Sequence, residues 1–161
     1  MNPTILVTRS LDGVIGVNGL HPFSNIEDIK DKNERIKNQT VILGRNAYEA
    51  LGGYLPSAQI IPLSRTGIEG IQTAKSLDDA LELTIEGRTP YILGGEETFN
   101  SALMNPLVRR VVITTIPEDF RFKIQRSHVE RVSYFHELSS EWKEISCRPK
   151  ESIIIRTYER K

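Results

Sequence analysis

The chain has 161 residues, a length that suits one domain able to bury a substantial hydrophobic core. Its 21 basic and 21 acidic residues cancel, which argues against a nucleic-acid coat protein or a polybasic membrane binder, because both need a charge excess of one sign. The single cysteine excludes an internal disulfide, and the three histidines lack the spacing of metal ligands. With no long apolar run and no signal-peptide pattern, the sequence predicts a soluble, cytoplasmic, single domain over residues 1–161.

Short apolar segments rich in β-branched residues recur along the chain and predict strands. Several are apolar at every position, as expected for strands covered on both faces of a parallel sheet. Pro62 lacks the N–H that a ladder needs, so its strand is expected at a sheet edge or at a bulge. The predicted strands are Thr4–Thr8, Thr40–Leu43, Gln59–Leu63, Tyr91–Leu93, Arg110–Ile116 and Ser152–Tyr158.

The first helix signal lies between the first two of these strands. Ser24, followed three residues later by Glu27, has the pattern of a capping box, in which each side chain satisfies a backbone amide of the first turn. Apolar residues then repeat at helical spacing and predict one buried stripe. That stripe consists of Ile26, Ile29 and Ile36.

Further helix signals follow the later strands. Ser76 precedes a periodic segment that begins at Leu77, and shorter helices are expected after Arg45 and Gly95. Strands that alternate with short helices predict an α/β fold with an open, mostly parallel central sheet and flanking helices. Periodicity is lost over residues 120–134, which predicts a loop that leads into a C-terminal antiparallel pair of strands.

Two glycine-containing turns between strand and helix are candidate phosphate sites: Gly44–Ala47 and Gly94–Gly95. Backbone amides at a helix N-terminus point outward at the positive end of the helix dipole and favour anions. Taken alone, each turn is more often a tight connection than a phosphate site. Neither matches the usual dinucleotide or Walker pattern.

Asp28 is the acidic residue whose position suggests chemistry. It lies about 100° around the helix from the isoleucine stripe, at the margin of the predicted buried face. From spacing alone, the ordinary explanation is complementarity to the helix dipole or an ion pair with Lys32, four residues further on. Ordinary roles are also expected for His21 in an exposed loop and for Thr114, Trp142 and Cys147 in packing.

Taken together, the motifs resemble the dihydrofolate reductase family. The N-terminal third matches through Asp12–Gly19, then Pro22-Phe23, then Asp28, in the family's order and spacing. The resemblance is good from residue 4 to about residue 117, and beyond that only Trp142 and the final strand look familiar. The other matching segments are Val41–Glu49, Leu55-Pro56, Leu63–Arg65, Lys75-Ser76, Gly94-Gly95 with Phe99, and Ile113-Thr114.

This resemblance implies NADPH-dependent reduction of 7,8-dihydrofolate to 5,6,7,8-tetrahydrofolate, with hydride transfer to C6 and protonation at N5, by a monomer. It implies that Asp28 holds the pterin ring, braced by Thr114, with Phe23 as a further catalytic position. The segment from Asn18 to Phe23 corresponds to a mobile loop that closes over the nicotinamide. The glycine pair corresponds to a cis-linked pair in the family.

By the same resemblance, two sets of residues are expected to line the site, with no metal, nucleic acid or membrane as a partner. Three cations in the first set correspond to segments near the adenosine 2′-phosphate and favour NADPH over NADH. The cofactor set is Val7, Ile15, Asn18, Gly19, Leu20, Gly44, Arg45, Asn46, Ala47, Leu63, Ser64, Arg65, Lys75, Gly94, Gly95, Glu96, Glu97 and Thr98. The substrate set is Leu6, Val7, Asp28, Ile29, Lys32, Leu51, Leu55, Leu93, Phe99 and Thr114.

The chain departs from the family pattern where the folate tail is expected. The arginine that usually clamps the tail carboxylate is replaced by Ala58, and the usual aromatic residue one turn beyond the acid is Lys32. Residues 117–120 replace the family's Gly-Asp-Thr segment, and Glu96 adds negative charge near a phosphate turn. Two alternatives therefore stay open: the related NADPH-dependent pyrimidine reductase of riboflavin synthesis, and a non-catalytic folate or nucleotide binder.

Overall fold

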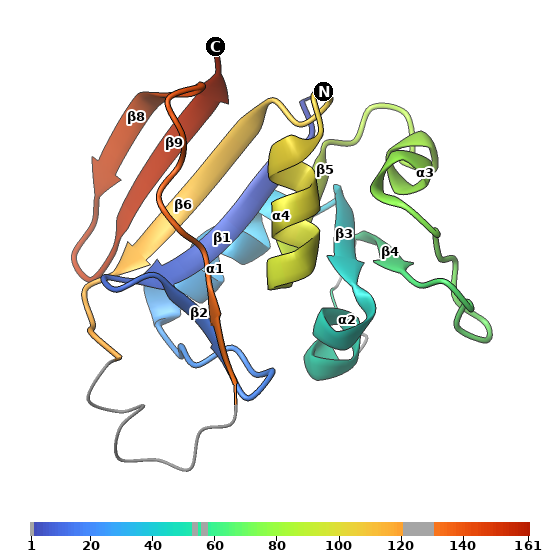
Figure 1. The fold of residues 1–161 in the computed structure, drawn as a ribbon, viewed down its shortest axis with the longest axis horizontal. Coiled ribbons are helices and arrows are strands. Elements are labelled where there is room, and N and C mark those ends of the chain that lie inside the picture. Colours follow the sequence, from blue (N-terminus) through green and yellow to red (C-terminus); the bar gives the residue numbers. More distant parts are fainter. Residues whose placement is uncertain (1, 53–54, 56–57, 121–130) are drawn as a thin grey trace.

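A computed structural model of the chain describes residues 2–52, 55, 58–120 and 131–161 (Figure 1). Strands and short helices alternate along most of its length. The elements are β1 (Thr4–Ser10), β2 (Val14–Val17), α1 (Ile26–Ile36), β3 (Thr40–Gly44), α2 (Arg45–Leu51), β4 (Gln59–Leu63), α3 (Leu77–Glu82), β5 (Pro90–Gly94), α4 (Glu96–Met104), β6 (Arg110–Ile116), β7 (Val132–Tyr134), β8 (Trp142–Pro149) and β9 (Ile154–Arg160).

The central sheet has the strand order β4-β3-β5-β1-β6-β9-β8, and β2 pairs separately with β7. Strands β4, β3, β5, β1 and β6 run parallel, whereas β9 is antiparallel to both β6 and β8. This confirms the predicted open, mostly parallel sheet with a C-terminal antiparallel pair. Strand β4 lies at the edge, as Pro62 predicts, because an edge strand has one side that needs no ladder donor.

Apolar side chains from both faces of the sheet form two core clusters. Along β1, Ile5 and Val7 enter the cluster that α3 and α4 cover, while Leu6 enters the cluster that α1 and α2 cover. Figure 1 shows α4 in front of the sheet and α1 behind it. The sheet is therefore sandwiched between two helical layers.

Helix α1 begins one residue later than its sequence suggests. Asn25 is the N-cap, and its side chain accepts a hydrogen bond from the backbone N–H of Asp28 at 3.0 Å. The predicted capping box at Ser24 is wrong, because Glu27 instead accepts a hydrogen bond from the backbone N–H of Ser152 at 2.6 Å. The helix start is thus fixed to the segment just before β9, a contact that local sequence does not reveal.

The predicted apolar stripe of α1 is also wrong. Ile26 and Ile29 are 81% and 48% exposed, and of the three isoleucines only Ile36 is buried. Asp28 and Asp31 are buried in their place. The helix therefore turns a polar face inward, which is unusual for a surface helix unless that face lines a site or satisfies its charges.

The other predicted helices are present, and Ser76 caps α3 by accepting from the N–H of Asp79 at 3.1 Å. Strand β7 replaces the end of the predicted loop, and residues 121–130 of that loop lie outside the described part.

Trp142 is buried beneath Arg160, whose guanidinium carbon lies 4.3 Å from the centre of the Trp142 ring. Cys147 is exposed on the edge strand β8, so its expected packing role is wrong. Within the described residues, no helix is long and apolar enough to cross a membrane.

Candidate active site

Asp28 is the most deeply buried acidic residue in the described helices, with 1% of its surface exposed. It lies in the first turn of α1, where the positive end of the helix dipole favours a carboxylate. One carboxylate oxygen, Oδ1, accepts a hydrogen bond from the hydroxyl of Thr8 on β1 at 2.7 Å. The other, Oδ2, lies 3.6 Å from the ammonium nitrogen of Lys32.

The hydroxyl that contacts Asp28 is therefore not the expected one. Thr114 stands beside Thr8 on the neighbouring strand β6, and the two are direct register partners. Within the described residues, the Thr114 hydroxyl is buried and has no hydrogen-bond partner. The expected bracing of Asp28 by Thr114 is replaced by Thr8, and the Thr114 hydroxyl is left available to a bound molecule.

Lys32 adds a second charge to this pocket. Its side chain is 23% exposed, and burial lowers the pKa of its ammonium group, an effect that the nearby Asp28 carboxylate opposes. The predicted ion pair between Asp28 and Lys32 is thus confirmed. It does not exclude the functional interpretation, because the same pair sits beside an unsatisfied buried hydroxyl at the end of two central strands.

An aromatic cluster adjoins the carboxylate through the loop before α1. Phe23 is 9% exposed and makes edge-to-face contacts with His21 at 4.9 Å and with Phe120 at 5.2 Å between ring centres. The ring of His21 keeps an exposed edge, as expected, yet its inner side is covered by protein. That burial, followed by the nearby Lys32 charge, lowers the pKa of His21 to about 4.

The segment between β2 and this loop is a tight turn. Val17 and Leu20 exchange backbone hydrogen bonds, and Asn18 and Gly19 take the left-handed conformation, with φ of 51° and 79°. Asn18 also pairs with the backbone of Arg131, just before β7. Exposed residues 18–20 project beyond the sheet, and their mobility stays a prediction.

The two glycine turns lie against each other. A Cβ atom added to Gly44, the N-cap of α2, would stand 3.0 Å from the hydroxyl oxygen of Thr98 and 3.7 Å from the carbonyl oxygen of Gly94. A Cβ at Gly44 would require the Thr98 hydroxyl to shift by a few tenths of an ångström, so glycine favours this close approach of the two strand-to-helix turns. The Gly94–Gly95 bond is cis, as the resemblance implies.

Gly95, the N-cap of α4, faces open space, since a Cβ added there would meet nothing within 4 Å. Neither glycine N-cap carries a side-chain hydrogen bond to the first turn of its helix. The first-turn amides of both helices are therefore uncapped by side chains, side by side, and at the positive ends of two dipoles. This arrangement is suited to an anion such as a pyrophosphate.

Polar side chains extend from this cradle toward β4. Arg45 donates to the hydroxyl of Thr66 at 3.1 Å and reaches that of Ser64 at 3.5 Å, while its other edge pairs with Glu49 at 3.1 Å. Ser64 is buried and accepts from the N–H of Gly67. Arg65 and Lys75 are exposed and lie at the two ends of the segment that follows β4. This segment returns to β4 through a bridge between Ala74 and Leu63.

Glu96, which adds negative charge next to the cradle, has a partner of its own. Its carboxylate accepts a hydrogen bond from the backbone N–H of Tyr134 in β7 at 2.6 Å. The side chain is thus directed toward the two-stranded sheet. The negative charge of Glu96 is therefore partly satisfied by a backbone N–H away from the glycine turns, whereas Glu97 is exposed.

The residues expected to touch the substrate fall into three groups. Leu6, Leu55 and Leu93 belong to the cluster on the α1 side, together with Asp28's helix. Ile29 and Leu51 expose apolar surface, with 48% and 38% accessible. Val7 and Phe99 belong to the opposite cluster, on the α4 side. The first group lies on the α1 side of the sheet, while the third lies on the opposite side.

Sequence reasoning missed one residue of this constellation, Thr8. A threonine in a buried strand is ordinarily a β-branched core residue, and nothing in its local sequence indicates a contact with an acid 20 positions away. No group of three or more His, Cys, Asp or Glu side chains within the described chain is arranged to hold a metal ion.

Comparison with known proteins places this geometry in a family. A family model described as dihydrofolate reductase matches residues 3–160. A dihydrofolate reductase type 3 of Salmonella typhimurium is 28% identical over 116 residues, 70% of this chain and 70% of that protein. A dihydrofolate reductase of Staphylococcus aureus is 29% identical over 124 residues, 75% of each chain.

A third relative is longer. The segregation and condensation protein A of Mycoplasma pneumoniae is 28% identical over 94 residues, which span 55% of this chain and only 18% of that protein. The family match, in contrast, extends over both core clusters, the paired glycine turns and the buried Asp28. The chain belongs to the dihydrofolate reductase family.

Proposed function

We propose that the protein reduces 7,8-dihydrofolate to 5,6,7,8-tetrahydrofolate with NADPH as the reductant, by hydride transfer to C6 and protonation at N5. The observation that carries this proposal is the Asp28 carboxylate, buried at the ends of β1 and β6 and bordered by the unpartnered Thr114 hydroxyl. A buried acid with polar groups around it, in a family of reductases, is best explained as a ligand-holding group.

Asp28 is proposed to accept hydrogen bonds from the amino group and adjacent ring nitrogen of the pterin. Its Oδ1 is already oriented by Thr8, so the carboxylate is fixed before the ligand arrives. A fixed anion at that edge of the ring orients it and favours the protonated form of N5. The buried Thr114 hydroxyl is available as a further hydrogen-bonding group for the bound ring.

The cradle formed by Gly44, Gly95 and Thr98 is proposed to hold the cofactor's pyrophosphate. The residues fit that group, because a Cβ at Gly44 would crowd the Thr98 hydroxyl while a Cβ at Gly95 would meet nothing within 4 Å. NADPH, when bound, supplies the hydride. The chain's own contribution is to present backbone amides and helix dipoles to the phosphates, and to fix the distance between cradle and Asp28 through the central strands.

Selectivity for the 2′-phosphate is assigned to Arg45, Arg65 and Lys75. Arg45 is oriented by the hydroxyls of Thr66 and Ser64, which keeps its guanidinium at the end of β4. Charge-assisted contacts to a phosphate dianion favour NADPH over NADH.

The folate tail is proposed to be held by other means than the family's arginine. Ala58 is partly buried against the α1-side cluster and offers no charge. Lys32 lies one helical turn beyond Asp28 and carries the nearest cation that the structure places at the pocket. In the free protein this cation is drawn toward Asp28, and we propose that tail binding draws it away.

The decisive experiment follows absorbance at 340 nm with NADPH and dihydrofolate, and compares the parent protein with Asp28→Asn. Turnover that Asp28→Asn abolishes supports the proposal and excludes the non-catalytic binder. No turnover with dihydrofolate, together with turnover of the ribosylated pyrimidine of riboflavin synthesis, selects the related pyrimidine reductase. Absence of turnover with both, but binding of NADPH, selects the binder.

A further inference from the structure

Thr8 and Asp28 form a buried hydrogen bond between a central strand and a surface helix. The distance from Thr8 Oγ1 to Asp28 Oδ1 is 2.7 Å, and the two residues are 2% and 1% exposed. A hydroxyl that donates to a carboxylate at this distance makes a charge-assisted hydrogen bond, which is about twice as strong as a neutral one. Buried from water, neither group has solvent as an alternative partner.

The neighbouring threonine provides an internal comparison. Thr8 and Thr114 are register partners on adjacent parallel strands, and both are fully buried. Only the Thr8 hydroxyl contacts the acid, while that of Thr114 has no partner in the described chain. The hydrogen bond is therefore not a general consequence of burying a threonine at this level of the sheet.

The backbone and the second oxygen of Asp28 are also held. Asn25 caps the helix by accepting from the N–H of Asp28 at 3.0 Å, which fixes the backbone from which the carboxylate extends. Lys32 approaches Oδ2, yet only to 3.6 Å and from a flexible side chain. Among the residues that the structure describes, Thr8 is consequently the one rigid group that contacts a carboxylate oxygen of Asp28.

We propose that Thr8 is a positioning residue, which fixes the rotation of the Asp28 carboxylate by engaging Oδ1 and so presents Oδ2 to the ring-recognition edge of the ligand. The inference rests on the proposed function, because it assumes that Asp28 holds the ring. Its central consequence, however, is a property of the free protein: the Thr8 hydroxyl holds the Asp28 carboxylate in one orientation.

Other charges around the pair must be kept constant in a test. Lys32 faces Asp28 from the same helix, Asp31 interacts with Lys32, and His21 approaches Lys32 from the preceding loop. On the sheet side, Thr8 and Thr114 carry no charge. Substituting Thr8 leaves every one of these charged groups in place.

The test follows the side-chain carboxyl carbon of Asp28 by NMR in protein labelled with 13C-aspartate, with the resonance assigned by its loss in Asp28→Asn. We expect Thr8→Val to change the chemical shift of this carbon at pH 7, because the hydrogen bond from the hydroxyl to Oδ1 is lost. Thr8→Ser restores the hydroxyl and is expected to return the chemical shift to that of the parent. Thr8→Ala is a second hydroxyl-free variant for the case that valine impairs folding.

Thr4→Val is the matched control. Thr4 is buried on the same strand, and its hydroxyl donates to the backbone carbonyl of Asn2 at 2.7 Å, at the end of β1 away from Asp28. It should alter stability but leave the chemical shift of the Asp28 carboxyl carbon in place. An unchanged chemical shift in both Thr8→Val and Thr8→Ala overturns the proposal, and so does a change in Thr8→Ser as large as that in Thr8→Val.

Activity separates this inference from the proposed function. If the parent reduces dihydrofolate, Thr8→Val should lower kcat/KM at neutral pH by about tenfold, and Thr8→Ser should recover it. A changed chemical shift in Thr8→Val without turnover of dihydrofolate by any variant supports the contact between Thr8 and Asp28 and refutes the proposed reaction. Turnover in the parent with an unchanged chemical shift in Thr8→Val refutes only the role of Thr8.

Discussion

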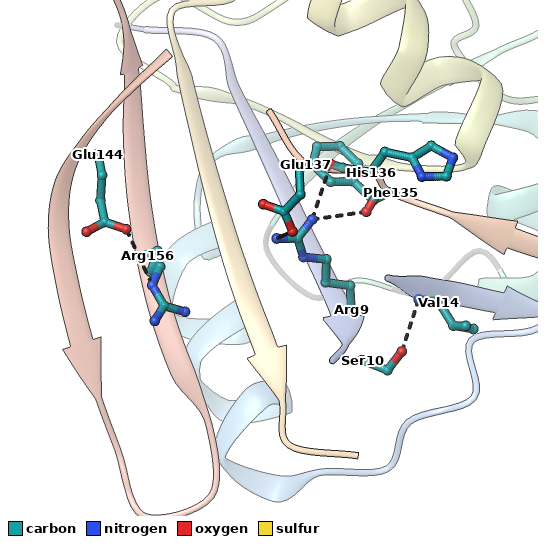
Figure 2. A network of polar contacts seen from close by, with 8 residues as sticks. All are labelled: Arg9, Ser10, Val14, Phe135, His136, Glu137, Glu144 and Arg156. Carbon is teal, nitrogen blue, oxygen red and sulfur yellow. Dashed lines mark hydrogen bonds and ion pairs between the residues drawn. The ribbon is translucent and has the colours of Figure 1, made fainter. Parts of the chain in front are cut away.

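Arg9 connects β1 of the central sheet to the segment that follows the β2-β7 strand pair. We expect its substitution to lower the free energy of unfolding more than a surface substitution does. Figure 2 shows the Arg9 guanidinium extended toward the segment that follows β7. It donates to the backbone carbonyls of Phe135 at 3.0 Å and His136 at 3.2 Å, and pairs with Glu137 at 3.1 Å. The Arg9 side chain is only 11% exposed. Arg9→Met keeps most of the apolar stem and removes every one of these contacts.

The expected cost follows from the burial of each partner. Phe135 is 2% exposed, so its carbonyl loses a partner that water does not readily replace, at about 1–3 kcal/mol. The guanidinium also lies 6.0 Å from the centre of the Phe135 ring, which adds about 0.5–1 kcal/mol. His136 and Glu137 are exposed, and the pair with Glu137 contributes about 0–1 kcal/mol. Together these contributions give a loss of about 1.5–5 kcal/mol in the free energy of unfolding.

Urea and thermal unfolding measure this loss. For a chain of this size, 1 kcal/mol corresponds to about 2–4 °C, so Tm should fall by about 3–20 °C. Arg156→Met is the matched control, because Arg156 pairs with Glu144 at 3.4 Å and both side chains are more than a third exposed (Figure 2). Glu137→Gln should likewise have little effect, since the Glu137 side chain is 90% exposed. If Arg9→Met costs no more than Arg156→Met, the buried carbonyl contact does not stabilise the fold.

Asp28→Asn should fold normally and lose about 10²–10⁴-fold in turnover at pH 7, with the rate rising as pH falls and the substrate is protonated by solvent; near-parental turnover at pH 7 would contradict its role. Arg65→Gln should raise KM for NADPH and leave KM for NADH nearly unchanged, whereas equal losses would place Arg65 away from the 2′-phosphate. Ala58→Arg should tighten dihydrofolate and methotrexate binding by about 10- to 150-fold and leave tail-less trimethoprim unchanged, as measured by titration calorimetry; unchanged methotrexate affinity would show that Ala58 does not face the tail. Burial, followed by the positive charge of Lys32, lowers the pKa of His21 from 6.5 to about 4, so the folded state favours the neutral ring. The free energy of unfolding should therefore fall as pH drops from 6.5 toward 4. His21→Gln should flatten that loss in urea unfolding series, and an identical pH slope in parent and variant would refute it.

Features that depend on local chemistry were predictable from the sequence. A buried parallel strand has a continuous apolar pattern, and Pro62 marked the edge strand because proline lacks a ladder donor. The turns at Gly44 and Gly94 were predictable as strand-to-helix connections for the same reason, since their conformation is set within a few residues. The Ser76 cap of α3 belongs to this class as well.

Features that depend on distant contacts were not predictable. The start of α1 is decided by Ser152, which engages Glu27 and leaves Asn25 as the cap. Its inward face is polar, with Asp28 and Asp31 buried, so the isoleucine pattern pointed to the wrong side. Strands β2 and β7 are short and pair across more than a hundred residues, too little sequence for a periodic signal. The contact between Thr8 and Asp28 has the same origin.

The position of β9 has a consequence for how the protein is made. Strand β8 is joined to the sheet only through β9, which lies between β8 and β6. During synthesis, residues 4–116 can therefore assemble β4, β3, β5, β1 and β6, while β8 emerges with no neighbour to pair with. The open side of β6 stays unpaired until residues as far as Arg160 have left the ribosome. Until then the nascent chain exposes an unpaired edge at the middle of its future sheet, the kind of surface that chaperones protect.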